Sequence, residues 1–498
     1  MQQGAVANVR FVIQPQAASG GFSPAESTNE GSVMSDENTV LKRSRANGLV
    51  IRSAIVASVG GLIFGFDTAV ISGTTKALKL VFNLTPQSLG FTVASATIGT
   101  IVGALSGGGL ADKYGRKKLL FVIGALFLVG SLGTALAPAS AYWLFLASRF
   151  LGGVGVGMAS VCAPIYIAEI APARQRGRLV GLVQFNIVLG ILVAYASNAI
   201  IRAIAPADTA WRWMLGVMAV PSILFLLLLF TVPETPRWLM AQGREDEAEN
   251  ISRKLCSSQE ESDQELIEIR QQIERDLEQS KTQVSFFSKR YRKIILMAIA
   301  IAAFNQLSGI NAILYYAPMV MQEAGAGEGA SYLMSIAVGF MNLVATMTAL
   351  TVIDKLGRRT LMLVGSIGYL VSLGFLTFVM FRFDGHFTSG SSILVLVGLL
   401  VFIAAHAFGQ GSVIWVFISE IFPNKVRGAG QSVGSTTHWT FAAITSGVFP
   451  SMIAFLGGGW SFLIFFLCMC GQLVWVLKVM PETKGIPLEE MSKKLGVE

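Results

Sequence analysis

The 498-residue sequence is poor in charge, because Asp, Glu, Lys and Arg together make up only 14% of it. Soluble globular domains carry about 25% charged residues, so this composition excludes a soluble globular protein. Hydrophobic residues make up 53% of the chain, which is about 264 residues (0.53 × 498) and enough for about twelve membrane helices of about 20 residues each. We therefore expect an all-α membrane protein.

Cysteine and histidine are also scarce, at four and three residues. The cysteines have no paired spacing, which argues against a disulfide scaffold and a metal site. The sequence shows no nucleophile–base arrangement, so we expect neither an enzyme nor a cofactor. The net charge of +8 would suggest nucleic acid in a soluble protein. Here the basic residues lie in short loops between apolar runs, where they set membrane topology, and we expect no nucleic-acid partner.

Apolar runs long enough to cross a bilayer follow one another along the chain. They occupy residues 49–72, 88–111, 119–137, 142–166, 179–203, 211–232, 293–320, 331–353, 360–381, 392–419, 429–456 and 459–480. A long charged gap after the sixth run separates two sets of six. The gap places Leu266, Ile269 and Ile273 at helical spacing, which predicts short amphipathic helices at the membrane surface.

This organisation predicts five segments. Residues 1–48 are polar and lack the apolar core of a signal peptide, which indicates a disordered cytoplasmic N-terminal tail. We assign residues 49–236 to an N-terminal six-helix bundle, 237–292 to cytoplasmic linker helices, 293–481 to a C-terminal six-helix bundle, and 482–498 to a cytoplasmic tail.

Basic residues gather in alternate loops. The loops after the second, fourth, eighth and tenth runs contain Lys113, Arg116, Lys117, Lys118, Arg174, Arg176, Arg178, Lys355, Arg358, Arg359, Lys425 and Arg427. The loops on the other side contain Lys76, Lys79, Arg202, Arg212 and Arg382. By the positive-inside rule, both termini and the linker are predicted to be cytoplasmic.

Three motifs occur twice, in the same order and on the same side of the membrane. LADKYGRKK (110–118) matches VIDKLGRRT (352–360), EIAPARQRGR (169–178) matches EIFPNKVRGAG (420–430), and PETPRW (233–238) matches PETKG (481–485). The pattern indicates a duplicated six-helix unit with parallel repeats, a type of protein in which two bundles rock about a site at the midplane.

The repeated motifs place carboxylates and guanidinium groups at matching depth on the cytoplasmic side. The set is Asp112, Arg116, Glu169, Arg178, Glu234, Arg237, Asp354, Arg358, Glu420, Arg427 and Glu482. We predict an inter-helix salt-bridge network that holds the cytoplasmic side shut in the outward-open state and breaks in the inward-open one. The alternative is a set of solvated charges beside the membrane.

Two charged residues lie well inside apolar runs, away from the charged positions at the ends of the runs. Asp67 lies about two-thirds along the first run, and an unpaired carboxylate at that depth costs several kcal/mol, so it is expected to be protonated or paired. Arg149 in the fourth run is the arginine placed to form an ion pair with Asp67. A carboxylate that alternates between a protonated and an arginine-paired form couples proton binding to conformation. The alternative is a permanent structural ion pair.

Uncharged polar residues gather at mid-depth in the apolar runs: Gln184, Asn305, Gln306, Asn311, Asn342, Trp415 and His438. Amides donate and accept hydrogen bonds and indoles stack on sugar rings, so the set suits a neutral sugar or polyol. On an unbroken helix Gln306 and Asn311 would lie about 140° apart, so they share a cavity only if the helix bends or unwinds near Gly309. Single amides can instead serve as inter-helix hydrogen bonds.

Glycines in GGVGVG (152–157) and GGG (107–109) place small residues where helices can approach closely. They do not form a phosphate loop, because no Lys-Ser or Lys-Thr follows and no strand precedes them. A nucleotide-driven pump is therefore disfavoured.

The chain resembles the sugar porter family of the major facilitator superfamily through DKYGRK, RFLGGVGVG, PETPRWL, QLSGINAILYYAP, DKLGRR, WVFISEIFP and PETKG, spread over about residues 50–490. The resemblance implies twelve helices in two bundles and monosaccharide transport by alternating access. It implies that the amides and Trp415 contact the sugar. It also implies that Tyr315 and Tyr316 form an extracellular gate. It also favours proton symport, because proton-coupled members resemble this chain in having Asp at position 67 with Arg at 149.

Several positions depart from the family pattern, which leaves the sugar open. Asn305 stands where Gln is frequent, Ser412 where a kinking proline is common, His438 and Ala442 where amides are frequent, and His406 where an aromatic residue is frequent. The two histidines are expected either to contact substrate, to titrate, or to be satisfied interior residues.

The prediction is a monosaccharide:H⁺ symporter of the plasma membrane, monomeric, with a small neutral sugar or polyol, protons and membrane lipid as its partners. A facilitative uniporter with a structural Asp67 is the first alternative. The second is a membrane sugar sensor that does not transport.

Overall fold

The computed structural model describes residues 47–173, 175–281 and 286–497, and the described residues form helices and connecting turns with no strand. The predicted disordered tail, 1–48, lies outside the described residues except for its last two positions. Asn47 caps the first helix, because its side chain accepts hydrogen bonds from the backbone N–H groups of Leu49 and Val50.

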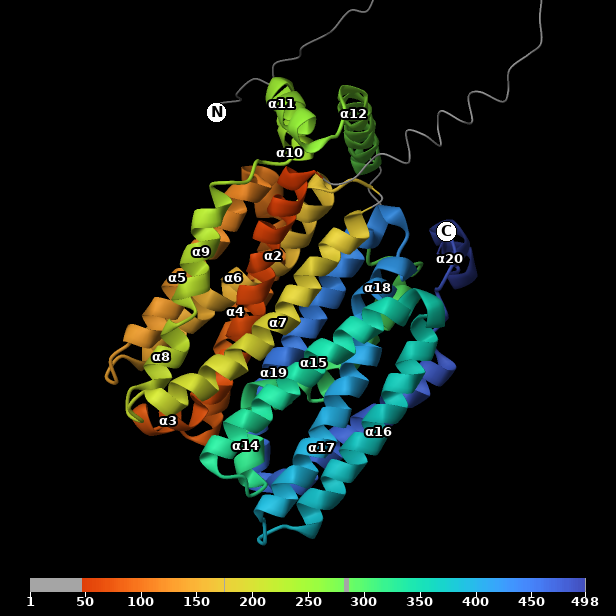
Figure 1. Ribbon diagram of the computed structural model, residues 1–498. Helices are drawn as coiled ribbons and strands as arrows, with labels where there is room; N and C mark the ends of the chain where they lie inside the picture. The colour runs from red at the N-terminus through yellow and green to blue at the C-terminus, as the bar shows by residue number, and fades with distance from the viewer. Residues whose placement is uncertain (1–46, 174, 282–285, 498) are drawn as a thin grey trace, which may run out of the picture. The chain divides into compact units, whose positions relative to one another are not determined.

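The first group of spans runs from α2 to α9 (Figure 1). Its elements are α2 (Gly48–Val70), η1 (Ile71–Gly73), α3 (Thr75–Val81), α4 (Pro86–Tyr114), α5 (Arg116–Leu136), α6 (Tyr142–Ile170), α7 (Arg176–Ile204), α8 (Ala210–Gly216) and α9 (Ala219–Leu229). The predicted linker helices are confirmed as α10 (Pro236–Ala241), α11 (Glu245–Leu255) and α12 (Gln259–Lys281).

The second group of spans follows the linker. Its elements are α13 (Arg292–Leu307), α14 (Ile310–Glu323), α15 (Glu328–Leu356), α16 (Arg358–Arg382), α17 (Ser389–His406), η2 (Ala407–Gly411), α18 (Ser412–Ile421), η3 (Asn424–Val426), α19 (Arg427–Lys478) and α20 (Leu488–Leu495). The predicted C-terminal tail thus contains a short helix, whose Met491 and Leu495 are buried against the second group.

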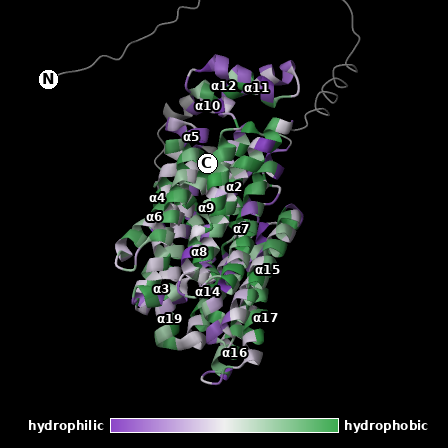
Figure 2. Cartoon of the chain, turned by 60° about the vertical axis from the view of Figure 1, so that its left-hand side comes forward, coloured by the Kyte–Doolittle hydropathy of each residue, from purple (hydrophilic) through white to green (hydrophobic). Residues whose placement is uncertain are grey.

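Eleven helical segments among the described residues are long and apolar enough to cross a membrane. The last of them, α19, has 52 residues and would be about 78 Å long if straight, far more than the bilayer core of about 30 Å. Its Gly457 has the non-helical dihedrals φ 80° and ψ 168°, which divide it into two spans. The twelve predicted spans therefore all appear, and Figure 2 shows them mostly hydrophobic beside the hydrophilic α11 and α12.

Close packing in the first group depends on glycine. An ideal Cβ on Gly153 of α6 would lie 1.8 Å from the carbonyl oxygen of Ala96 on α4, and one on Gly157 would lie 2.2 Å from that of Thr100. The expected close approach is therefore confirmed for GGVGVG. It is wrong for Gly108, which has no atom within 4 Å of its built Cβ, because it points away from α6.

Two spans of the second group are interrupted. Gly309, with a left-handed φ of 86°, separates α13 from α14, so the predicted discontinuity in the seventh span is confirmed. A glycine suits this position because it adopts positive φ without a steric penalty. The tenth span contains the π-helical turn η2 between α17 and α18, and such turns are frequent at functional sites.

We call the end of the spans where α10–α12 lie the basic end, and the other the opposite end. The two groups contact each other through α4 with α19 and α7 with α15. Four polar pairs join them at the opposite end. The Tyr332 hydroxyl donates to the Gly73 carbonyl at 2.7 Å, and the Tyr195 hydroxyl donates to the Leu314 carbonyl at 2.6 Å. Glu328 pairs with Arg202 at 3.1 Å and with Lys76 at 3.9 Å.

Candidate functional site: a buried ion pair beside an amide cluster

The two charged residues inside the apolar runs form an ion pair. Arg149 Nη1 donates to Asp67 Oδ1 at 2.6 Å, and both side chains are 6% exposed. Asp67 comes from α2 and Arg149 from α6, two continuous helices that pack side by side. The Nε of Arg149 is buried without a hydrogen-bond partner among the described residues, so the carboxylate satisfies only part of the guanidinium group.

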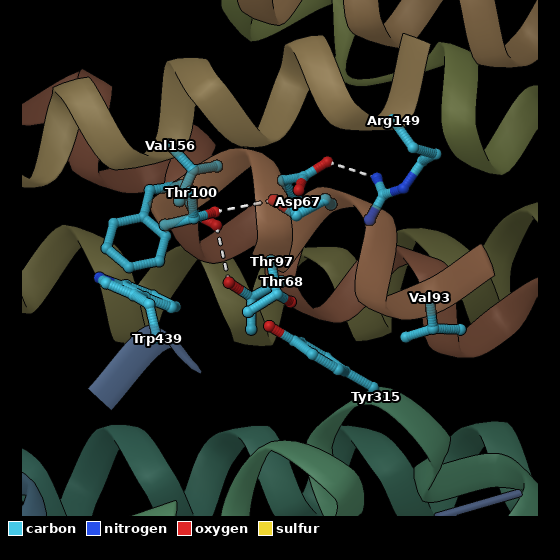
Figure 3. Close-up of a pocket in the computed structure, with 11 residues that line it drawn as sticks. Asp67, Thr68, Val93, Thr97, Thr100, Arg149, Val156, Tyr315 and Trp439 are labelled. Carbon is cyan, nitrogen blue, oxygen red and sulfur yellow. Dashed lines mark hydrogen bonds and ion pairs between the residues drawn. The ribbon is translucent and has the colours of Figure 1, made fainter. Parts of the chain in front are cut away.

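A small cavity of about 10 Å³ adjoins this pair (Figure 3), which is room for about one water molecule. Its lining from the first group is Phe64, Asp67, Thr68, Val93, Ala96, Thr97, Thr100, Arg149 and Val156. Tyr315 of α14 and Trp439 of α19 complete it from the second group. The ion pair is therefore enclosed by residues of both groups.

Sequence reasoning missed most of this lining. Thr97 and Thr100 lie on α4, and Trp439 packs its ring 5.8 Å from that of Phe64 across the two groups. Threonines and aromatic residues are ordinary in apolar runs, so only the position of Trp439 next to His438 gave a signal.

Four of the predicted sugar contacts come together. Gln306 Nε2 donates to Asn305 Oδ1 at 2.9 Å and lies 3.3 Å from His438 Nε2. The His438 ring lies 5.1 Å from that of Trp415 and 4.9 Å from that of Trp439. Trp439 therefore lies between this amide cluster and the cavity of the ion pair. The Oε1 of Gln306 is buried without a partner among the described residues, and it is free to accept from a ligand hydroxyl.

The other three predicted contacts do not hydrogen-bond to this cluster. The Oδ1 of Asn342 on α15 accepts from the Thr346 hydroxyl at 3.4 Å. Gln184 on α7 and Asn311 on α14 make no side-chain hydrogen bond to any residue in the described part of the chain. The Asn311 side chain is nevertheless buried, since the residue is only 8% exposed.

The tenth span contributes two more polar groups. His406 Nδ1 lies 2.6 Å from the Tyr369 hydroxyl, so His406 is the satisfied interior histidine of the alternatives. Gln410 in η2 is fully buried, and neither of its amide atoms has a partner within the described chain. Its amide stands in an otherwise apolar run, and this is the pattern in the sequence that marks it.

The two tyrosines of the predicted gate lie on α14. Tyr315 faces the Asp67 cavity (Figure 3). Tyr316 is fully buried, has the non-helical dihedrals φ −125° and ψ 19°, and donates to the Ser446 carbonyl at 3.0 Å. The chain bends here, where α14 packs against α2 and η1.

At the basic end, the first group forms one cluster around Arg116. Its Nη2 lies 2.9 Å from Asp112 and 3.0 Å from Glu169, and the other Glu169 oxygen accepts from the Thr235 hydroxyl at 2.7 Å. The Glu234 carboxylate accepts from the backbone N–H groups of Arg116 and Lys117. It therefore caps the N-terminus of α5, where a negative charge is favoured.

The second group repeats this cluster around Arg358. The guanidinium group lies 3.1 Å from Asp354 and 2.8 Å from Glu420. Glu482 accepts from the backbone N–H of Arg358 at 2.9 Å and of Arg359 at 3.0 Å, so it caps α16 as Glu234 caps α5. Each cluster therefore pairs residues of its own group, and within the part of the chain that the structure describes neither forms an ion pair across the two groups.

Three of the predicted network arginines lie apart from these clusters. Arg178 is exposed and has no ion pair with a described carboxylate. Arg237 pairs with Asp276 of α12 at 3.0 Å. Arg427 has buried Nε and Nη2 atoms without a partner among the described residues.

The two capping carboxylates differ in their electrostatics. Burial is the largest influence on Glu234 and raises its pKa, in spite of the backbone N–H donors around it. Burial acts in the same direction on Glu482, but donors from Lys484, Arg358, Arg359 and Thr483 together outweigh it and lower its pKa.

Comparisons with known proteins place these features in context. The family described as sugar (and other) transporter matches residues 53–495. The D-xylose-proton symporter of Escherichia coli K12 is 35% identical over 472 residues, covering 88% of this chain and 94% of its own. The arabinose-proton symporter of Bacillus subtilis is 34% identical over 462 residues, covering 92% and 97%.

Solved structures agree with the sequence relatives. The inward-open xylose transporter XylE from E. coli superposes with a TM-score of 0.78 at 34% identity, over 89% of this chain and 99% of that one. The same transporter bound to 6-bromo-6-deoxy-D-glucose gives 0.73 at 34% identity, over 90% and 99%.

Proposed function

This chain belongs to the sugar porter family of the major facilitator superfamily, and from that premise we propose that it is a monosaccharide:H⁺ symporter that works by alternating access. It is a multi-pass membrane transporter of the plasma membrane and not an enzyme. Its relatives include symporters of D-xylose and arabinose, so the substrate is a pentose, a hexose or a related polyol.

The observation that carries the proposal is the Asp67–Arg149 pair, buried next to a cavity that both groups of helices enclose. A proton on Asp67 removes the charge that holds Arg149. Tyr315 and Trp439 complete the cavity from the second group. A change in the ion pair therefore changes the contacts at the interface between the groups. Trp439 in turn contacts His438 of the amide cluster, which links the proton site to the sugar site.

The sugar site is built on the second group. Gln306 offers an unpartnered buried acceptor, and Trp415 offers an indole face on which a sugar ring can stack. Asn305 and His438 orient the Gln306 amide. Gln184, Asn311 and Asn342 complete the site when sugar is bound.

The conformation fits an inward-facing state, because the four polar pairs that join the groups lie at the opposite end. In this state Tyr315 and Tyr316 close the extracellular gate. The Arg116 and Arg358 clusters belong to the cytoplasmic gate, and they meet across the groups in the outward-facing state. Arg178, Arg237 and Arg427 are available to them there.

The basic end is cytoplasmic by the positive-inside rule, so both termini and α10–α12 are cytoplasmic. Residues 49–236 and 293–481 form the two rocking bundles, and the transporter acts as a monomer. One proton contributes about 2.3 kcal/mol per 100 mV, which sustains roughly fifty-fold sugar accumulation.

The test is uptake of D-xylose, L-arabinose and D-glucose into proteoliposomes under an imposed pH gradient. In the wild type, an inward proton gradient drives accumulation. In Asp67→Asn, accumulation is lost while counterflow continues, because the amide cannot carry the proton. Asp208→Asn makes the same change at an exposed loop position and is expected to behave as wild type.

Equal accumulation by wild type and Asp67→Asn would show that Asp67 does not carry the coupled proton. Counterflow in the wild type without any gradient-driven accumulation would establish a uniporter. Binding of sugar without any flux would establish a sensor. A Gln306→Ala variant that retains wild-type sugar affinity would remove the second group from the binding site.

A further inference from the structure

A cavity at the basic end lies outside the transport path. It has a volume of about 430 Å³ between the start of α5 and the helices α10 and α11. Its lining is Lys117, Lys118, Phe121, Pro233, Glu234, Trp238, Leu239, Arg244, Glu247 and Ile251. Figure 1 shows α10 and α11 at the ends of α5 and α9.

The charge of this cavity is unbalanced. The two carboxylates in its wall are both engaged, since Glu234 accepts backbone N–H groups and Glu247 pairs with Arg244. Lys117 and Lys118 form no ion pair with any carboxylate in the described part of the chain. The cavity therefore presents two unpaired ammonium groups, which suit an anion.

The rest of the lining is apolar and aromatic, and Phe121 connects it to an exposed apolar surface of the bundle. The Phe121 ring lies 4.9 Å from that of Phe230, which is 73% exposed on α9. Large apolar residues farther along the same two helices are also exposed: Val122, Val129, Leu132 and Leu136 on α5, and Leu224 and Leu227 on α9. An occupant here combines an anionic head with an apolar chain.

The internal repeat shows that this arrangement is not a by-product of the motif. With the offset of 242 residues that relates Arg116 to Arg358 (358 − 116), Lys117 corresponds to Arg359 and Lys118 to Thr360. Arg359 is satisfied by the carbonyl oxygens of Val476 and Leu477. The first group alone therefore has two unpaired cations at this place.

We propose that the cavity binds the phosphate headgroup of an anionic phospholipid from the cytoplasmic leaflet. Lys117 and Lys118 contact the phosphate, and the acyl chain lies along Phe121 and Phe230. The lipid holds α11 against α5. The far end of α11 is already fixed to α2, because Asn47 Nδ2 donates to the carbonyls of Lys254 and Leu255. The bound lipid thus clamps the linker helices onto the first group.

The experiment measures binding and melting temperature of the purified full chain in detergent, so it does not depend on transport. Dioleoyl phosphatidylglycerol is compared with dioleoyl phosphatidylcholine. The anionic lipid is expected to raise the melting temperature by about 2–4 °C. Each lysine near an anionic lipid contributes about a fivefold factor in affinity, so Lys117→Gln/Lys118→Gln is expected to weaken binding about 25-fold.

The matched control is Lys113→Gln/Lys293→Gln, which removes two basic-end charges outside the cavity and is expected to retain the lipid effect. Lys117→Arg/Lys118→Arg is expected to rescue it, and Lys118→Gln alone serves if the double variant does not fold. The proposal is overturned if inorganic phosphate stabilises the protein as well as the lipid does. It is also overturned if the glutamine and control variants lose lipid binding equally.

Discussion

The two groups of spans repeat the same charged motifs but differ in the continuity of their helices. In the first group, the first and fourth spans are the unbroken helices α2 and α6, of 23 and 29 residues. In the second group, their counterparts are broken, at Gly309 in the seventh span and at η2 in the tenth. The duplication has kept the clusters at the basic end and has changed the interior.

The difference separates two kinds of chemistry. The charged pair lies on the continuous helices, where rigid backbones fix the distance between Asp67 and Arg149. Asn305 and Gln306 lie just before the break at Gly309, and Gln410 lies in η2. An interruption lets side chains reach into one site from either side of it. With the offset of 251 residues that relates Glu169 to Glu420 (420 − 169), the counterpart of Arg149 is Leu400, so the second group has no such cation.

The largest effect is expected for Arg149→Leu, which gives the first group the residue of the second. It leaves the Asp67 carboxylate buried without a partner, and breaking such a pair costs about 3–5 kcal/mol. Asp67→Asn/Arg149→Leu is expected to recover part of that loss, because no charge remains buried. Thermal unfolding in detergent measures both. Equal losses in the single and double variants would show that the pair is not coupled.

A somewhat smaller loss is expected for Gly153→Ala, about 2–3 kcal/mol from overpacking. The new methyl group would lie 1.8 Å from a backbone oxygen of α4, so two rigid helices must separate. Gly409→Ala is the comparison in the second group, where the nearest atom is the Gly365 Cα at 2.9 Å and the turn η2 can adjust. Gly108→Ala, with open space, is the control.

The melting temperatures of these three variants show which group adjusts more easily to an added methyl group. The expected order of destabilisation is Gly153→Ala, then Gly409→Ala, then Gly108→Ala. If Gly409→Ala were the most damaging, the interrupted span would be the less adaptable one, and the contrast between the groups would be reversed.

A third comparison uses the two arginine clusters. The Glu169 side chain is 7% exposed and that of Glu420 is 25% exposed. The two arginines are equally buried, so the difference lies in the carboxylate that is lost. Glu169→Gln removes the more buried carboxylate and is expected to lower the free energy of unfolding by about 2–3 kcal/mol, against about 1 kcal/mol for Glu420→Gln. Unfolding by heat in the same detergent measures the two side by side. An equal cost would mean that both clusters are equally solvated.

The fold was largely predictable because long apolar runs and the positions of basic residues carry most of the information on a membrane protein. The spans, the linker helices and the break at Gly309 follow from such patterns. The turn η2 and the helix α20 did not follow from them. A π-helical turn contains one extra residue, and an apolar run shows no sign of that residue in its sequence. A short C-terminal helix depends on the surface that buries Met491 and Leu495.

The candidate site was predictable in its members and not in its assembly. Asp67 and Arg149 were the two charges well inside apolar runs and away from the ends of the runs, so each was the natural partner of the other. The grouping of Gln306 with His438, and the position of Trp439 between them and the ion pair, depend on helix rotation. Sequence periodicity specifies a face of a helix but not the neighbour that the face meets.

The smallest expected effect concerns the two capping carboxylates. The pKa of Glu234 is raised by burial, so the folded protein holds this proton more readily than the unfolded chain. The contribution of Glu234 to stability therefore falls as the pH rises from the ordinary value of a glutamate through the raised one. The pKa of Glu482 is lowered, so its contribution is present above the ordinary value and is lost as the pH falls through the lowered one.

The two caps are thus expected to respond to acid in opposite directions. Melting temperatures measured between about pH 4 and pH 7 should show Glu482→Gln less stable than wild type at neutral pH, with the gap closing in acid. At neutral pH, Glu234→Gln should lower the melting temperature less than Glu482→Gln does, because the loss of the cap at Glu234 is partly offset by the removal of a buried charge. As the pH falls, wild-type Glu234 gains its proton and wild type becomes more stable relative to Glu234→Gln. Parallel pH profiles for the two variants would mean that α10 and α11 do not change the environment of Glu234, and that the two basic-end clusters are electrostatically equivalent.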